Sequence, residues 1–240
     1  MKKIVALIPA RSGSKRIKNK NIVLVDNYPL VSYSIAAAKS SKLIEEVYVS
    51  TDSSKIAKIA NKYGAKTPFL RPKSISKDNS IDSMFFNHFL SYLKKNNLTL
   101  PELIVHLSPT VPFREYGVID KAIKYLKKYP KSTSLRSVNK IPLSPYKIFQ
   151  KKGLYLKGFF SNIKYEYYNM PKQKFPETYL PNGQVDIIKT KQIKKNSLHG
   201  NKMLSYNSNP SLDIDHPEDL LKIKSYIDDS RYSYLKKYLI

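Results

Sequence analysis

The chain has 240 residues, a formal net charge of +25 from 43 Lys and Arg against 18 Asp and Glu, and no cysteine. Its length suits a single domain, residues 1–240, with a substantial core, and the missing cysteines exclude a disulfide scaffold and thiol chemistry and fit a cytoplasmic protein. The excess charge is mostly lysine scattered through every segment, which favours compositional bias over a dedicated nucleic-acid surface, so we expect no nucleic-acid partner.

An apolar run at residues 4–8 opens the chain. Such a run is typical of a strand buried on both faces of a parallel sheet, and Pro9 ends it because proline has no N–H for a ladder. Since Pro9 and Arg11 cut the run short, it predicts a first strand and not a signal peptide. No stretch approaches the roughly 20 apolar residues that cross a bilayer, so we expect no membrane partner.

A loop rich in cations and small residues follows at residues 11–21, and Arg11, Gly13 and Lys15 lie near its start. Glycine lets the backbone approach a ligand, hydroxyls and N–H groups donate hydrogen bonds, and cations offset phosphate charges. Open α/β sheets bind ligands where their strands end, so the loop predicts a polyphosphate site; a solvated basic turn is the alternative. It contains neither GxGxxG nor GxxxxGKS/T, which argues against a dinucleotide dehydrogenase and a P-loop ATPase.

Helical and strand patterns alternate through the next part of the chain. Helices are predicted over residues 30–39, 55–63, 83–94 and 115–128, and strands over residues 46–50, 66–70, 103–107 and 132–138. This alternation indicates βαβ units, hence an α/β fold with a mainly parallel central sheet flanked by helices. We interpret Asp52 as a helix N-cap. His106 lies inside an apolar run, which favours a core histidine over a general base.

Residues 140–183 differ in composition from the rest of the chain, because tyrosine, lysine and proline replace the alternating apolar patterns. With a hairpin-like turn at residues 150–153, the segment predicts a small β-rich arm within the domain. Its aromatic side chains suggest a dimer contact, and an excursion that covers the site is the alternative. A turn at residues 182–183, strands at 184–188 and 202–206, and an amphipathic helix from 216 to about 238 complete the predicted elements.

Asp213 and Asp215 form the second chemical signal. Two residues apart in an extended segment, their carboxylates project to the same side. Adjacent like charges are costly without a cation, and hard oxygen ligands suit Mg²⁺, so the pair predicts a magnesium site. The alternative is that Asp215 caps the helix that begins near Pro217, which would leave Asp213 without a role.

Six motifs together resemble the acylneuraminate cytidylyltransferase (CMP-sialic acid synthetase) family over essentially the whole chain. They are IPARSGSKRIKNKN (8–21), STD (50–52), LRP (70–72), SPTVPFR (108–114), PNG (181–183) and LDIDHPEDL (212–220). The resemblance implies a nucleotide-diphospho-sugar transferase-like fold and a homodimer built through the arm. It also implies Mg²⁺-dependent transfer of CMP from CTP to the anomeric hydroxyl of an acidic nine-carbon (nonulosonic) sugar, with pyrophosphate leaving.

The resemblance also carries residue roles over by position. CTP would be bound by Arg11, Ser14, Lys15, Lys20, Asn21, Arg71 and Asp78, the sugar by Ser108, Lys147, Lys172 and Asn182, and Mg²⁺ by Asp213 and Asp215. The expected catalytic residues are Arg11, Lys20, Asp213 and Asp215, with the two cations stabilising the departing pyrophosphate.

Two departures from the family pattern leave the acceptor sugar open. Ser108 stands where the family usually has Gln, and NGQVDI (182–187) replaces the more frequent NGAIYI. Two other functions therefore remain as alternatives: a cytidylyltransferase for 3-deoxy-octulosonate, and an inactive module that binds RNA or another polyanion.

Overall fold

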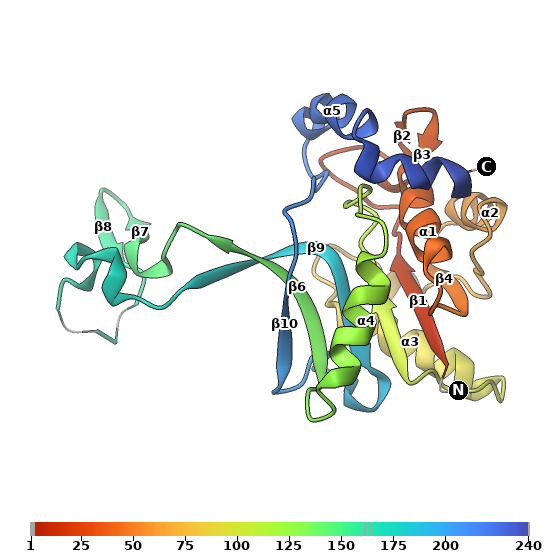
Figure 1. Cartoon of the computed structure of the whole chain (residues 1–240), viewed down its shortest axis with the longest axis horizontal. Helices are drawn as coiled ribbons and strands as arrows, with labels where there is room; N and C mark the ends of the chain where they lie inside the picture. The colour runs from red at the N-terminus through yellow and green to blue at the C-terminus, as the bar shows by residue number, and fades with distance from the viewer. Residues whose placement is uncertain (1–2, 161, 164, 240) are drawn as a thin grey trace.

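The computed structural model describes residues 3–160, 162–163 and 165–239. Within these residues, six strands form one central sheet in the order β10-β6-β9-β5-β1-β4 (Figure 1). The strands are β1 (Ile4–Pro9), β4 (Glu46–Ser50), β5 (Leu103–His106), β6 (Ser134–Ile141), β9 (Thr178–Lys189) and β10 (Met203–Asn207). β1 pairs in parallel with β4 and β5, and β10 with β6, whereas β9 runs antiparallel between β5 and β6. The predicted α/β fold with a mainly parallel sheet is confirmed.

Helices cover both faces of the sheet (Figure 1). They are α1 (Leu30–Ser40), α2 (Ser54–Lys62), α3 (Asp82–Lys95), α4 (Val118–Lys128) and the short α5 (Ile223–Ile227). Alternate residues of β1 point to opposite faces: Ala6 and Ile8 pack in the larger core with α1, α2 and α4, and Val5 and Leu7 pack against the phenylalanines of α3. None of the helices in the described ranges is both long and apolar enough to cross a membrane.

Two predicted strand features differ in the structure. Residues 66–70 make two isolated bridges beside β4 and no continuous strand, since Pro68 lacks the N–H that a ladder needs. The turn predicted at residues 182–183 is a bulge inside the long strand β9. There Gly183 has φ +69°, and the register with β6 shifts between Arg136 and Val138.

The predicted C-terminal helix is broken into three pieces: 3₁₀ turns at Pro217–Lys222 and Ser230–Tyr238, with α5 between them. The second break has a local cause. The Asp229 side chain accepts a hydrogen bond from the Arg231 backbone N–H at 2.9 Å, which caps a new helical segment and competes with continuation of the first.

β6 and β9 continue beyond the sheet as a two-stranded ribbon that carries the predicted arm (Figure 1). At its end lies the hairpin of β7 (Phe149–Lys152) and β8 (Tyr155–Gly158). The small strands β2 (Leu24–Val25) and β3 (Tyr28–Pro29) form a separate hairpin before α1. The arm has its own aromatic cluster, in which Tyr146 stacks on Phe175 at 4.8 Å between ring centroids. Leu154 and Tyr155 at the hairpin tip are 91% and 79% exposed in the single chain.

Candidate active site

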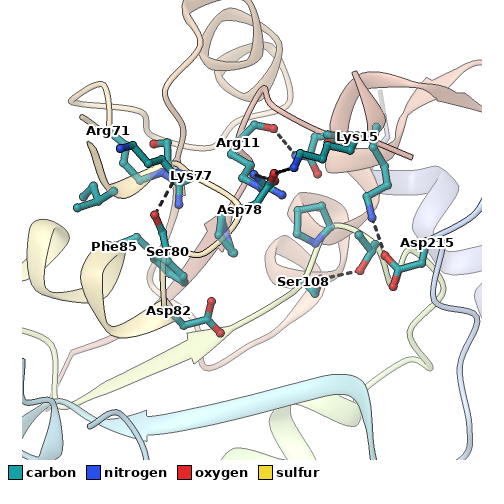
Figure 2. A pocket seen from close by; sticks show the side chains of 18 of the residues that line it. Arg11, Lys15, Arg71, Lys77, Asp78, Ser80, Asp82, Phe85, Ser108 and Asp215 are labelled. Carbon is teal, nitrogen blue, oxygen red and sulfur yellow. Dashed lines mark hydrogen bonds and ion pairs between the residues drawn. The ribbon is translucent and has the colours of Figure 1, made fainter. Parts of the chain in front are cut away.

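A cavity of about 520 Å³ opens where β1 and β5 end (Figure 2), a volume in the range of ligand pockets. Four stretches of the chain line it. They are the loop after β1 (Pro9, Arg11, Ser14, Lys15, Arg16, Ile17, Lys20, Asn21), the segment leading into α3 (Arg71, Ile75, Ser76, Lys77, Asp78, Ser80, Ile81, Asp82, Phe85), the loop after β5 (Ser108, Pro109, Thr110) and Asp215. The structure therefore brings together the seven residues predicted for CTP, together with Ser108 and Asp215.

The side chains of Asn21 and Asp52 hold the loop after β1 in place by hydrogen bonds. Asn21 is 6% exposed, and its Nδ2 donates to the Arg11 carbonyl at 2.8 Å. The backbone N–H and hydroxyl of Ser12 donate to the two carboxylate oxygens of Asp52, each at 2.8 Å. Ser53, not Asp52, caps α2 by accepting from Ile56 N. The N-cap interpretation of Asp52 is therefore wrong, because its carboxylate fastens the loop.

Asp78 forms ion pairs with two of the cations that are predicted to bind the phosphates of CTP. Its carboxylate oxygens lie 2.5 Å from Nη1 of Arg11 and 2.5 Å from Nζ of Lys15 (Figure 2). Hydrogen bonds from Lys15 and then Arg11 lower the pKa of Asp78 below its usual value. In the free chain this carboxylate thus takes the place that an anionic ligand of the two cations would occupy.

Lys20 and Asp215 face each other across the cavity mouth. Nζ of Lys20 lies 2.7 Å from Oδ1 of Asp215, and Nη1 of Arg16 lies 3.6 Å from Oδ2. The capping alternative for Asp215 is wrong: His216 is the N-cap, and Oδ2 of Asp219 accepts the backbone N–H groups of Asp215 and His216 at 3.0 and 2.9 Å. The Asp215 side chain is therefore available to the cavity.

Asp213, unlike Asp215, is not among the cavity-lining residues. The Ile214 N–H donates to the Thr110 carbonyl at 2.7 Å, which fixes the segment beside the loop after β5. Although solvent reaches Asp213, the surrounding protein desolvates its charged form and raises its pKa, and the nearby Asp215 charge raises it further. A cation between the two carboxylates would relieve this repulsion.

The donor set fits Mg²⁺ in its usual manner of binding. Two carboxylates lie close enough to interact, and the Lys20 ammonium that pairs with Oδ1 of Asp215 would have to share or give up that oxygen when the ion binds. No cluster of three or more His, Cys, Asp or Glu suited to a metal occurs in the described part of the chain. Mg²⁺ is commonly held by one or two carboxylates plus substrate phosphates and water, so two protein ligands suffice.

Arg71 is a buried cation that faces the cavity. It is 6% exposed, and its guanidinium carbon lies 5.6 Å from the centroid of the Phe85 ring. Burial lowers its pKa. Within the described residues, Nε and Nη2 of Arg71 have no hydrogen-bond partner. Buried donors are normally paired, so Arg71 is a strong candidate to bind an oxygen-rich ligand.

The loop after β5 is organised by Arg114, to which the sequence analysis assigned no role. The residue is fully buried, and burial lowers its pKa to about 10, which leaves it protonated at neutral pH. Its guanidinium donates to the hydroxyl of Ser34 and to four carbonyls, those of Ser108, Val111, Gly183 and Gln184. The sequence did contain a signal for this role, because Arg114 is the one charged residue in an otherwise apolar, proline-rich stretch at 108–114.

Other lining residues were also missed as site residues, among them Arg16, Lys77 and Phe85. Arg16 belongs to the cation-rich loop, and Lys77 precedes Asp78, so both could have been found by their place in the chain. Phe85 follows the helical pattern of the core, to which it also belongs at 3% exposure.

Three predicted sugar ligands lie away from the cavity of their own chain. Lys147 is in the arm, where Nζ donates to the carbonyls of Tyr168 and Met170, and Lys172 lines a separate hollow of the arm. Asn182 lies at the bulge of β9, and its Nδ2 donates to Ser208 Oγ at 2.9 Å. Their assignment to the sugar stays a prediction.

Solved structures share the fold at low sequence identity. The structure of CMP:2-keto-3-deoxy-manno-octonic acid synthetase complexed with CTP has a TM-score of 0.66 and 14% identity, covering 93% of this chain and 97% of that one. A cytidylyltransferase from Leptospira borgpetersenii has a TM-score of 0.62 and 17% identity, covering 99% and 93%. At these identities the likeness is one of fold.

Sequence relatives are more specific. The chain is 37% identical over 224 residues to the N-acylneuraminate cytidylyltransferase of Escherichia coli O18:K1:H7, which covers 90% of this chain but only 50% of that relative's length. It is 34% identical to the CMP-N,N′-diacetyllegionaminic acid synthase of Legionella pneumophila, covering 90% of this chain and 93% of that protein. Residues 5–174 match the family model described as cytidylyltransferase. The chain therefore belongs to the cytidylyltransferase family and is of the N-acylneuraminate cytidylyltransferase type, as its motifs predicted.

Proposed function

We propose that this protein transfers CMP from CTP to the anomeric hydroxyl of a nonulosonic acid and releases pyrophosphate, with Mg²⁺ as cofactor. One observation carries the proposal: the cavity combines a wall of cations, two of them held by Asp78, with the buried Arg71 guanidinium that lacks a partner in the described chain. Such a site is suited to a polyphosphate. The relatives named for N-acylneuraminate and diacetyllegionaminate support the acceptor class.

The triphosphate would replace Asp78 as the partner of Arg11 and Lys15, so Asp78, which the family resemblance assigns to CTP binding, would compete with the nucleotide instead. Lys20 would then lie between the phosphates and Asp215, where its positive charge can stabilise the leaving pyrophosphate. The sugar hydroxyl attacks the α-phosphorus in line, and the bond to the β-phosphate oxygen breaks. Reactions of this kind depend on positioning and charge neutralisation more than on covalent participation by the protein, which agrees with a site built from cations.

Asp213 and Asp215 would hold Mg²⁺. When bound, the ion would neutralise phosphate charge and favour ionisation of the attacking hydroxyl. The protein's own part is to keep the two carboxylates in place: Asp219 binds the backbone N–H of Asp215, and Thr110 binds the N–H of Ile214 between them.

We also propose a homodimer formed through the arm, with Lys147 and Lys172 contacting sugar bound to the second copy. The tip of the arm exposes Leu154 and Tyr155, and apolar surface of this kind is typical of a protein contact. Both lysines belong to the arm segment and neither lines the cavity of its own chain, which is consistent with this arrangement; Figure 1 shows the arm extending away from the central sheet.

The test is pyrophosphate release from CTP and Mg²⁺ with a panel of acidic sugars: N-acetylneuraminate, legionaminate, pseudaminate and 3-deoxy-octulosonate. ATP, GTP and UTP are the nucleotide controls. Release with CTP and a nine-carbon acid supports the proposal, whereas release with 3-deoxy-octulosonate alone would replace the acceptor. No turnover together with salt-sensitive RNA binding would favour the polyanion-binding alternative.

A further inference from the structure

A row of polar side chains crosses three neighbouring strands next to the cavity. His106 on β5 is paired with Asp186 on β9, and Asp186 with Arg136 on β6. Arg136 donates to Oδ2 of Asp186 from Nε at 3.0 Å and from Nη2 at 2.8 Å, and Nη2 lies 3.0 Å from Nε2 of His199. The carboxylate is thus neutralised by the guanidinium, and the row is a polar surface without a strong net charge.

The row adjoins the cavity at the end of β5. The ring of His106 lies 5.7 Å from that of Phe85 between centroids, and Phe85 lines the cavity together with Ser108, two residues beyond His106 (Figure 2). Burial lowers the pKa of His106, which keeps the imidazole neutral at neutral pH. His106, Asp186 and Arg136 do not line the cavity themselves; the row reaches it through the contact between His106 and Phe85.

Gln184 on β9 lies close to Ser108 along this edge, although Gln184 is not itself among the residues that line the cavity. It precedes Asp186 by two residues in the same strand. The Arg114 guanidinium binds the carbonyl of Gln184 at 2.7 Å and that of Ser108 at 2.8 Å, which places the two residues side by side. At 108 the chain has only a short hydroxymethyl side chain, whereas the neighbouring strand supplies a carboxamide.

The carboxamide of Gln184 has no partner in the described part of the chain. The residue is 1% exposed, and neither Nε2 nor Oε1 makes a hydrogen bond with any described residue. Buried polar side chains are nearly always paired, because desolvation without a hydrogen bond is costly. Two unpaired atoms on one buried side chain beside a cavity indicate a group that the protein binds from outside the chain.

The chemistry of this group follows from the carboxamide and its surroundings. A carboxamide offers both a hydrogen-bond donor and an acceptor. Another amide can pair with both, because it accepts from the N–H and donates to the oxygen. The Asp186–Arg136 ion pair, two residues further along β9, leaves no net charge to attract a charged substituent, so a neutral substituent fits better than a charged one. Among acidic sugars, an N-acylamino group has these properties.

We propose that Gln184 is a specificity-determining residue that hydrogen-bonds the N-acylamino substituent of the acceptor beside Ser108, supported by the Asp186–Arg136 pair. The inference rests on the proposed function and deepens it. Because Gln184 does not line the cavity in this structure, its carboxamide would have to change rotamer toward Ser108 to reach the bound sugar, and the acceptor would then supply the partners that the described residues do not. An acceptor with a hydroxyl in this position makes only part of the interaction and is used less well.

The test compares kcat/KM for two acceptors at saturating CTP: N-acetylneuraminate or N,N′-diacetyllegionaminate, whichever the wild type uses faster, and the analogue of that sugar with hydroxyl in place of acylamino. Gln184→Met keeps the length of the side chain and removes both hydrogen-bonding atoms. It should lower kcat/KM for the acylated acceptor about 10- to 100-fold and change that for the hydroxyl analogue by less than about threefold. Gln192→Met, in the 3₁₀ turn after β9, is the matched control and should change neither.

Three results would overturn the inference. One is an unchanged ratio of the two kcat/KM values in Gln184→Met. Another is an equal fall for both acceptors with a lower melting temperature, which would mean that Gln184 only supports the fold; we expect the variant to melt no lower than the wild type, because it loses an unpaired buried polar group. The third is a wild type that prefers an acceptor without an acylamino group. If the wild type releases no pyrophosphate with any acceptor, the proposed function fails as well.

Discussion

Lys20 and Asp215 are 195 residues apart in the chain, yet Nζ of the lysine lies 2.7 Å from Oδ1 of the aspartate. This ion pair joins the loop after the first strand to the carboxylate segment near the C-terminal end. The lysine side chain is 16% exposed and that of the aspartate 48%, so the pair lies at the boundary between cavity and solvent. It connects the cations expected to bind phosphate with the carboxylates expected to bind Mg²⁺.

Replacing Lys20 by alanine should lower kcat about 100- to 1,000-fold, because a positioned charge that stabilises a developing negative charge is lost. The variant should remain folded, since only a partly exposed ion pair is removed. Steady-state pyrophosphate release and circular dichroism test both points. Lys18→Ala, an exposed lysine of the same loop, is the control. Normal turnover in a folded Lys20→Ala protein would contradict this role.

Replacing Asp78 by asparagine should tighten CTP binding by about two- to fivefold, because Arg11 and Lys15 no longer have to break ion pairs with Asp78 before they bind phosphate. The effect is small because exposed ion pairs contribute little energy. Calorimetric titration with CTP measures it. Asp229→Asn breaks another exposed Arg–Asp pair, with Arg231 at 2.6 Å, and should leave the affinity unchanged. Weaker binding in Asp78→Asn would mean that the carboxylate contacts the nucleotide itself.

Removing divalent cations with EDTA should abolish turnover, and added Mg²⁺ should restore it. Asp213→Asn should raise the Mg²⁺ concentration for half-maximal activity at least about tenfold, because one of two charged oxygen ligands becomes neutral. Asp228→Asn, an exposed aspartate elsewhere near the C-terminal end, should leave the Mg²⁺ titration unchanged. Full activity of the wild type in EDTA would refute the magnesium assignment.

Replacing Asp219 by alanine should lower the free energy of unfolding by about 1 kcal/mol at pH 7, the usual cost of losing a helix cap. A backbone hydrogen bond from His216, then one from the Lys222 ammonium and one from the Asp215 backbone N–H, lower the pKa of Asp219 to about 2. Because the folded pKa lies below the unfolded one, this stability is present above about pH 4 and is lost as the pH falls toward about 2.

Urea unfolding at pH 7 and pH 2.5 measures the effect of Asp219→Ala. The difference between variant and wild type should shrink at the lower pH, and Glu218→Ala, which changes the exposed neighbour, should show little difference at either pH. A difference that persists undiminished in acid would show that the carboxylate charge is not its source.

Elements buried on both faces were predictable from sequence, because burial leaves a continuous apolar run. β1, β4 and β5 are of this kind, and the strand-end rule then predicted a ligand site in the loop after the first strand, where the structure has a cavity. Asp213 and Asp215 stood out in the sequence because two adjacent like charges are costly without a cation; their binding of magnesium stays a prediction.

Features that depend on distant partners were not predictable. The bulge at Gly183 looked like a turn because Pro181, Asn182 and Gly183 are turn residues; in the structure it is held by Arg114, 69 residues away. The pairing of Asp78 with Arg11 and Lys15, and the unpartnered carboxamide of Gln184, likewise arise from packing between segments that no local pattern connects.

The central claim is that the protein transfers the CMP group of CTP, which contains the α-phosphorus, to an acidic sugar bound in the cavity. The most direct measurement is incubation of the protein with α-³²P-labelled CTP, Mg²⁺ and the preferred acceptor, followed by separation of the products. The account predicts that the label moves into a CMP-sugar and that the pyrophosphate is unlabelled. Label that stays in CTP, or that appears only in free CMP whether or not the sugar is present, would contradict it.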